Sequence, residues 1–398
     1  MPDVDFVNLL GVLAIALAAP LLLGFAPRLK VPAVVLEIVV GIVVGPSVLG
    51  WLEPDLAVQI VSLLGLAMLL FLAGLEIDVH RLRGALLRIA VAGFLVSLAV
   101  GWSAGLALAG IGWLASPFLL AVTVSATSLG LVVAVLKDAR AVEGRLGQTV
   151  IAASSVADFG AVLLLSLVFS AGGGSAGSRL LLLVLFITLV LLIAATVALA
   201  ERWRRLGAVV VRLQDSTAEI RVRGAMVLLL AFVVLAERFG LESILGAFLA
   251  GAAVGVLDGD GEGRTTTHPH FRLKLDALGY GFLIPVFFVT SGLRLDVSGL
   301  VESPAALARV PVFVAVLLLA RGLPALAYWR WFGPRRTAAA ALLQATSLPF
   351  VVTATQIGVF TGRLDPVTAA GLVCAGLVSV LVFPAAAAAI GLGPDSTP

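Results

Sequence analysis

Charged side chains are scarce in this chain. Asp, Glu, Lys and Arg make up 12% of its 398 residues, whereas 61% of the residues are hydrophobic. A soluble globular domain carries about 25% charged residues, because its surface must face water. The composition therefore excludes an ordinary soluble protein and predicts an all-α integral membrane protein that crosses the bilayer many times.

Cysteine is nearly absent as well, since Cys374 is the only one. An internal disulfide is thus excluded, and a metal cluster held by thiolates has no ligands. The chain also lacks a glycine-rich phosphate loop and a His-Glu-x-x-His motif, so we expect neither an enzyme nor a nucleotide-driven pump, and no cofactor. Two neighbouring histidines, His268 and His270, are too few to indicate a metal site. The first apolar run follows two acidic residues rather than a basic segment, which favours a membrane span over a cleavable signal peptide.

Thirteen apolar windows are long enough to cross a bilayer, which takes about 20 residues of helix. The sequence therefore predicts thirteen transmembrane helices. They lie at residues 6–27, 31–52, 56–77, 84–110, 113–136, 146–170, 179–200, 224–240, 241–257, 272–293, 305–328, 337–361 and 366–391.

Lysine and arginine are distributed unevenly between the loops. Twenty of the twenty-six basic residues lie in or beside the loops that follow odd-numbered windows. Because basic loops stay in the cytoplasm, this distribution predicts an outer N-terminus and a cytoplasmic C-terminus in the cell membrane. The formal net charge of +3 is small and gives no reason to expect a nucleic-acid partner.

Three short phrases each have a similar second copy, and the three pairs come in the same order in both halves of the chain. The copies of each pair lie seven windows apart, an odd number, so they cross the membrane in opposite directions. The phrases are 41–45 and 251–255, 74–79 and 292–297, and 126–133 and 345–352. We therefore expect a single membrane domain over 1–398, built as an inverted repeat of six plus six helices. Repeat 1 covers about 6–170, a connecting helix about 179–200 and repeat 2 about 224–391.

The third phrase places hydroxyl side chains beside a glycine or proline, in the middle of an apolar window. A helix breaks most easily at such a point, so we expect two crossed discontinuous helices. Carbonyl groups and helix ends freed by the breaks can coordinate a cation. The candidate residues are Thr127, Ser128, Thr346 and Ser347, for which ordinary helix packing is the competing interpretation.

Asp158 is an acid near the middle of the window 146–170. Such an acid costs about 2.5–3.5 kcal/mol on membrane-insertion scales, which indicates a use. Burial favours the neutral form of this carboxyl group, whereas a nearby cation favours its charged form. Asp158 can therefore bind a proton or, as a metal ligand, a transported Na⁺ or K⁺. Ser154 and Ser155 lie one helical turn earlier and can add hydroxyl oxygens. The alternatives are an aspartate bonded only to backbone, and serines that only pack.

Arg321 is a second charge inside an apolar window. An arginine so deep needs a carboxylate or the carbonyl end of a helix as its partner. It can compensate charge by pairing with Asp158, or by neutralising the carbonyl ends of the crossed helices. The competing interpretation is an arginine that extends to the membrane surface.

Five phrases, at 37–50, 70–76, 125–129, 245–251 and 285–293, are distributed over most of the chain. As a set they resemble the bacterial monovalent cation:proton antiporters of the sodium/proton exchanger superfamily, in the branch that contains potassium-efflux antiporters. The resemblance implies a core domain with two crossed, interrupted helices, a dimerisation domain in a homodimer, and elevator-like alternating access.

For individual residues, the resemblance implies that Asp158 is the ion-binding aspartate and that Arg321 is the buried base of the bundle. It places Thr127, Ser128, Thr346 and Ser347 at the crossing of the unwound helices.

Two departures from the family pattern matter. Many relatives have two adjacent acids where this chain has Ala157 and Asp158. One carboxylate shared by one proton and one cation predicts electroneutral exchange. Some potassium-efflux relatives also carry a cytosolic nucleotide-binding domain after the last helix; the chain ends shortly after the last window, so we expect none.

The function we expect is secondary active antiport of a monovalent cation, Na⁺ or K⁺, against protons by alternating access across a lipid bilayer. A sodium-coupled organic-anion symporter of the same crossed-helix fold and a channel are the alternatives. The choice between Na⁺ and K⁺ depends on cavity size and ligand number, which one sequence leaves open.

Overall fold

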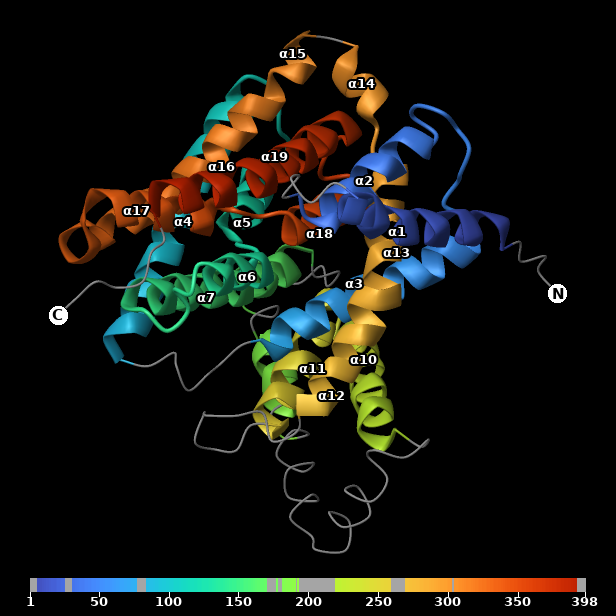
Figure 1. Ribbon diagram of the computed structural model, residues 1–398, viewed down its shortest axis with the longest axis horizontal. Coiled ribbons are helices and arrows are strands. Elements are labelled where there is room, and N and C mark those ends of the chain that lie inside the picture. The colour runs from blue at the N-terminus through green and yellow to red at the C-terminus, as the bar shows by residue number, and fades with distance from the viewer. Residues whose placement is uncertain are drawn as a thin grey trace, which may run out of the picture. The chain divides into compact units, whose positions relative to one another are not determined.

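The computed structural model describes residues 6–25, 31–76, 84–169, 177, 181–190, 192, 219–258, 269–302 and 304–391. Every regular element in these ranges is a helix (Figure 1). The α-helices are α1 (Val7–Phe25), α2 (Ala33–Val44), α3 (Leu56–Leu75), α4 (Gly84–Gly110), α5 (Pro117–Ser125), α6 (Leu129–Asp138), α7 (Arg145–Phe169), α10 (Ile220–Arg238), α11 (Ser243–Asp258), α12 (Pro269–Leu278), α13 (Ile284–Leu293), α14 (Val297–Val301), α15 (Pro304–Leu307), α16 (Arg309–Ala325), α17 (Trp329–Ala345), α18 (Pro349–Phe360) and α19 (Pro366–Gly391). A π-helix, η1 (Gly279–Leu283), joins α12 to α13, and a 3₁₀-helix, η2 (Leu326–Tyr328), joins α16 to α17.

Eight stretches of the described residues are long and apolar enough to cross a membrane. One of them, 304–360, contains two predicted windows. Three shorter apolar helices, Ala33–Val44, Leu181–Val190 and Ser243–Val256, coincide with further windows. The chain is therefore a membrane protein whose described ranges are all-helical, while the count of thirteen spans stays a prediction. Several predicted features, including His268 and half of the connecting helix at 179–200, lie outside the described residues.

The window predicted at 31–52 is longer than the helix it contains, because α2 ends at Val44. Gly45 leaves the helix with φ −74° and ψ 176°. It precedes Pro46, and the proline ring disfavours helical backbone in the residue before it. The chain then turns back, and the N–H of Gly50, at φ 63°, donates to the Gly45 carbonyl at 2.8 Å. Apolar composition alone did not reveal this stop.

The chain divides into two compact units, each of which contains segments from distant parts of the sequence. One unit comprises Met1–Ile60, Leu82–Ala161 and Pro285–Pro398, and the other comprises Val61–Arg81 and Val162–Ile284. All the candidate residues at the two helix breaks belong to the first unit. The site can therefore be built within this unit alone.

Two glycines of the first unit bring the backbones of α2 and α13 into direct contact. A Cβ atom added to Gly41 would lie 2.3 Å from the carbonyl oxygen of Val289. A Cβ atom added to Gly292 would lie 2.2 Å from the carbonyl oxygen of Ile38. Neither distance is possible for a real side chain, so glycine is required on both helices. Such small-residue contacts are typical of helix pairs in membranes.

The second unit contains the matching contact, between α3 and α11. A Cβ atom added to Gly74 would lie 2.0 Å from the carbonyl oxygen of Phe248. A Cβ atom added to Gly251 would lie 1.8 Å from the carbonyl oxygen of Phe71. In sequence, Gly74 and Gly251 are the counterparts of Gly292 and Gly41 in the duplicated phrases. In the first unit, the first copy of one phrase (Gly41) packs against the second copy of the other (Gly292). In the second unit, the second copy of the former (Gly251) packs against the first copy of the latter (Gly74).

Two spans are interrupted, each at one copy of the duplicated phrase 126–133 and 345–352. Backbone at 126–128 separates α5 from α6, and backbone at 346–348 separates α17 from α18. Pro349 occupies the first turn of α18, where its missing N–H costs nothing and its ring prevents α17 from continuing. α17 packs against α19 (Figure 1), so the second interrupted span lies along an uninterrupted helix.

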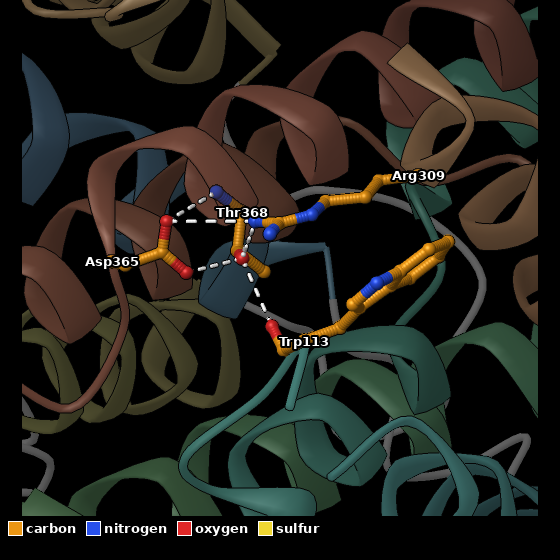
Figure 2. Close-up of polar contacts among 4 residues, drawn as sticks. All are labelled: Trp113, Arg309, Asp365 and Thr368. Carbon is orange, nitrogen blue, oxygen red and sulfur yellow. Dashed lines mark hydrogen bonds and ion pairs between the residues drawn. The ribbon is translucent and has the colours of Figure 1, made fainter. Parts of the chain in front are cut away.

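A polar cluster holds the starts of three helices together in the first unit (Figure 2). Arg309, at the start of α16, donates from Nη1 to the Thr368 hydroxyl at 2.6 Å, and the same nitrogen lies 3.6 Å from Asp365 Oδ1. The guanidinium carbon of Arg309 lies 5.7 Å from the centroid of the Trp113 ring, a cation–π contact. The Thr368 hydroxyl is 3.0 Å from the Trp113 carbonyl oxygen. Because Trp113 precedes α5, the cluster fixes where that interrupted span begins.

Candidate functional site

The two helix breaks contact each other through main-chain and hydroxyl groups. The N–H of Ser128 donates to the carbonyl oxygen of Thr346 at 2.8 Å. The Thr127 hydroxyl donates to the carbonyl oxygen of Gln344 at 2.8 Å. Residues 126, 127 and 346–348 are buried and Ser128 is partly buried, so these hydrogen bonds satisfy polar backbone groups that water reaches poorly. This contact is the structural centre of the site.

Asp158 reaches this contact from α7. Its Oδ1 accepts the N–H of Thr127 at 2.9 Å, and its Oδ2 accepts the N–H of Leu129 at 3.4 Å. Leu129 is the first residue of α6, so the carboxylate lies at the positive, N-terminal end of that helix. Asp158 is partly buried rather than enclosed. An acid in this position is stabilised by N–H donors and is still open to exchange with a small ion or a proton.

The serines near Asp158 differ in their hydrogen bonding. Ser155 donates its hydroxyl to the Ile151 carbonyl at 2.9 Å, one turn back along α7. The Ser154 hydroxyl is fully buried and has no hydrogen-bond partner among the residues that the structure describes. A buried unsatisfied hydroxyl costs about 1–3 kcal/mol, so its presence in a membrane helix asks for an explanation.

At the second break, too, one hydroxyl group is hydrogen-bonded within its own helix and the neighbouring one is not. Thr346 donates its hydroxyl to the Leu342 carbonyl at 3.1 Å, within its own helix. Ser347 Oγ is buried and, in the described part of the chain, finds no partner. Its backbone is held instead by Ser379, whose Oγ accepts the Ser347 N–H at 3.2 Å. Ser154 and Ser347 therefore each bring an uncommitted hydroxyl oxygen to the buried part of this unit.

Arg321 is 1% exposed, so the interpretation that it extends to the membrane surface is wrong. Its Nε donates to the Thr127 hydroxyl at 2.9 Å and to the Gln344 carbonyl at 3.4 Å. Its two terminal nitrogens donate to Ser97 Oγ at 3.2 Å and to the Ala153 carbonyl at 3.4 Å. Gln344 lies at the carbonyl end of α17, where a positive charge is favourable.

Sequence reasoning missed the polar residues that surround Arg321. Ser97, Gln344 and Tyr328 are buried, and Gln344 Nε2 donates to the Tyr328 hydroxyl at 3.4 Å. Ser379, which holds the second break, was also missed. The only signal was that Gln344 directly precedes the duplicated phrase at 345–352. Polar residues in an apolar helix are common enough that their positions alone did not point to a shared site.

The described residues contain no group of three or more His, Cys, Asp or Glu side chains that could hold a metal ion. The oxygens near Asp158 are of another kind: one carboxylate, hydroxyl groups, and carbonyl groups at helix breaks. Interrupted helices in transporters use this combination to bind small monovalent cations transiently. The donor set therefore suits a transported ion rather than a resident one.

The chain is similar in sequence to known proteins. A Bacillus subtilis protein with the provisional name Na⁺/H⁺ antiporter YjbQ is 31% identical over 379 residues, 90% of this chain. The chain spans only 58% of that relative's length. A Na⁺/H⁺ antiporter of Enterococcus hirae is 30% identical over 295 residues, 73% of this chain and 74% of its own length.

The fold is also shared with a solved structure, the sodium proton antiporter MjNhaP1 of Methanocaldococcus jannaschii. The TM-score is 0.67 at 18% sequence identity, over 96% of this chain and 95% of that one. The family model described as the transmembrane sodium/hydrogen exchanger matches residues 13–391. This chain therefore belongs to the sodium/hydrogen exchanger family.

Proposed function

We propose that the protein is a secondary antiporter that exchanges a monovalent cation, Na⁺ or K⁺, for protons. The observation that carries this proposal is the Asp158 carboxylate at the contact between two interrupted helices, bonded to the N–H groups of Thr127 and Leu129. A sequence family whose members include named Na⁺/H⁺ antiporters supports the same substrates. None of the relatives named above is an organic-anion symporter, so that alternative is not carried forward.

Competition at one carboxylate couples the two fluxes. The ionised Asp158 holds the cation, with oxygens from Ser154 and the breaks at Thr127, Ser128, Thr346 and Ser347; Ser155 stays bonded to its own helix and contributes less. Protonation removes the charge and releases the cation. Arg321 compensates the carbonyl end of α17 throughout. Because Ala157 provides no second acid, one proton replaces one cation, and the exchange is electroneutral.

The architecture we propose is an inverted repeat of thirteen helices in the cell membrane, with an outer N-terminus, a cytoplasmic C-terminus and a homodimeric assembly. Each predicted window overlaps at least one described helix. The two glycine contacts support the repeat, since the phrase that contains Gly41 meets the one that contains Gly292, and their counterparts Gly251 and Gly74 meet likewise. Alternating access then moves the single site between the two faces of the membrane.

The test is ion-gradient flux in liposomes that contain the purified protein and a trapped pH dye. Addition of Na⁺, K⁺ or Li⁺ in parallel is expected to move protons for at least one of the three ions. The Asp158→Asn variant, which keeps the shape but not the charge, is expected to reduce this signal to background. Glu302→Gln is the matched control, because Glu302 is an exposed acid between α14 and α15 and should keep full activity.

Two further readouts decide the outcome. Size-exclusion chromatography of Asp158→Asn is expected to match the wild type, which separates a lost site from a lost fold. A membrane-potential dye should not respond during exchange if the exchange is electroneutral. Cation-driven proton flux that persists in Asp158→Asn would remove the proposed mechanism.

A further inference from the structure

A cavity of about 280 Å³ lies in the first unit, between the ends of α13, α18 and α19. Its wall runs from buried residues to the surface, because Val352 is 1% exposed and Phe360 is 91% exposed. Both belong to α18, the helix that begins directly after the second break. The cavity therefore follows α18 from its exposed end to Val352, about one helical turn from the second break at 346–348.

The cavity wall is mostly apolar and carries a few polar groups. Ser291 and Gln356 are two of these polar groups, and Gln356 Nε2 donates to Ser291 Oγ at 2.7 Å. A space of this size has room for several water molecules.

Two charged residues at the end of α13, Arg294 and Asp296, also line the cavity. The Asp296 carboxylate is already committed: Oδ1 accepts the Ser298 hydroxyl at 2.7 Å and the Gly299 N–H at 3.1 Å, and so caps α14. These hydrogen bonds hold the pKa of Asp296 below its usual value. The Arg294 side chain is exposed, and within the described ranges its guanidinium makes no hydrogen bond or ion pair. The uncommitted charge of the cavity is therefore positive.

We infer that this cavity is the outer entrance to the cation site, and that Arg294 lowers the apparent affinity for cations that arrive from outside. The inference rests on the proposed antiport and on the proposed orientation. A positive charge at the rim repels an entering cation, and water and salt reduce the repulsion to about a threefold effect on apparent KM. In the duplicated phrase at 74–79 and 292–297, the first copy has an acid, Glu76, where the second copy has Arg294.

The functional consequence is an asymmetry between the two faces. Glu76 is the counterpart of Arg294 in the other copy of the phrase. Its Oε1 lies 3.8 Å from Arg272 Nη2 in the second unit, so this residue is acidic where Arg294 is basic, and it has an ion-pair partner. A lower affinity on the outer face favours release of an exported cation and slows its return. The two faces of the carrier would then differ although they share one binding site.

The experiment compares right-side-out with everted membrane vesicles, which expose the outer and the cytoplasmic face to the bath. We expect Arg294→Gln to lower the apparent KM for the bath cation about threefold in right-side-out vesicles and to leave it unchanged in everted ones. Arg294→Lys, which keeps the charge, should behave as the wild type. Added choline chloride should shrink the difference, because salt screens the repulsion.

Arg363→Gln is the matched control, since Arg363 is an exposed arginine in the turn after α18 but outside the cavity lining. It should leave both KM values unchanged. The inference fails if Arg294→Gln changes KM equally in both vesicle types, only in everted vesicles, or in neither. Wild-type vesicles without any cation-driven proton flux would instead contradict the proposed antiport itself, so the two failures are distinguishable.

Discussion

The hydroxyl groups around Asp158 fall into two kinds that the sequence does not distinguish. Ser154 and Ser155 are adjacent serines on one helix, and sequence reasoning gave them the same role. In the structure, Ser155 donates to the Ile151 carbonyl, whereas Ser154 is buried without a partner among the described residues. An unsatisfied buried hydroxyl is costly, and a transported cation is a partner that would satisfy its oxygen. We therefore propose Ser154, rather than Ser155, as the cation ligand.

Replacement of Ser154 by alanine tests this difference. We expect Ser154→Ala to raise the apparent KM for the transported cation about tenfold, because one oxygen contact to a charged species contributes about 1.5 kcal/mol. Stability should be unchanged or slightly higher, since the variant loses no hydrogen bond. Both quantities can be measured on purified protein, KM by dye flux in liposomes and stability by thermal unfolding in detergent.

Ser155→Ala is the control at the neighbouring position. Its hydroxyl already bonds to its own helix, so KM should change less than twofold. Equal effects of the two substitutions, or an unchanged KM in Ser154→Ala, would show that the uncommitted hydroxyl is not a ligand.

The residue scale is also where prediction from sequence was least complete. Asp158 was recognisable because an acid in an apolar window is rare and costly. The partners of Arg321 were not, because Ser97 lies 224 residues away along the chain. Which hydroxyl is left without a partner depends on side-chain rotamers and on neighbouring helices, and neither is encoded in a local pattern.

At the scale of elements, the helix breaks were predictable and helix ends were less so. The duplicated phrase combines hydroxyl side chains with Gly130 or Pro349, and both breaks occur there. The end of α2 at Val44 was missed because the residues after it stay apolar while Gly45 and Pro46 stop the helix. Local backbone chemistry decided this end, against the hydropathy of the window.

Close glycine contacts give a prediction about helix packing. Gly251→Ala would place a methyl group 1.8 Å from the Phe71 carbonyl oxygen, so α11 and α3 must separate. We expect a loss of about 2 kcal/mol or more in the free energy of unfolding, seen as a lower midpoint of thermal unfolding in detergent.

Gly224→Ala is the matched substitution, because Gly224 lies inside α10 and a Cβ atom there meets nothing within 4 Å. Both changes give the helix the same gain in intrinsic propensity, so the difference between them isolates the contact. Similar unfolding midpoints for the two variants would mean that α3 and α11 do not pack as closely as the structure has them.

At the scale of the whole molecule, the proposed mechanism depends on one acid and one buried arginine. The crossed breaks bring Asp158 to the N-terminal end of α6, and Arg321 to the carbonyl end of α17. Opposite helix ends thus each meet a compensating charge, which allows a polar site inside an apolar bundle. In the antiport proposed above, one carboxylate serves two ligands, so the proton and the cation exclude each other.

The most direct test of this exclusion is the pH dependence of the apparent KM for the cation, measured by flux in liposomes with equal pH on both sides. If proton and cation share Asp158, lowering the pH raises KM, by up to about tenfold per pH unit for one competing proton, while the maximal rate at saturating cation stays constant. A KM that is independent of pH, with a maximal rate that falls as protons are added, would contradict a shared site.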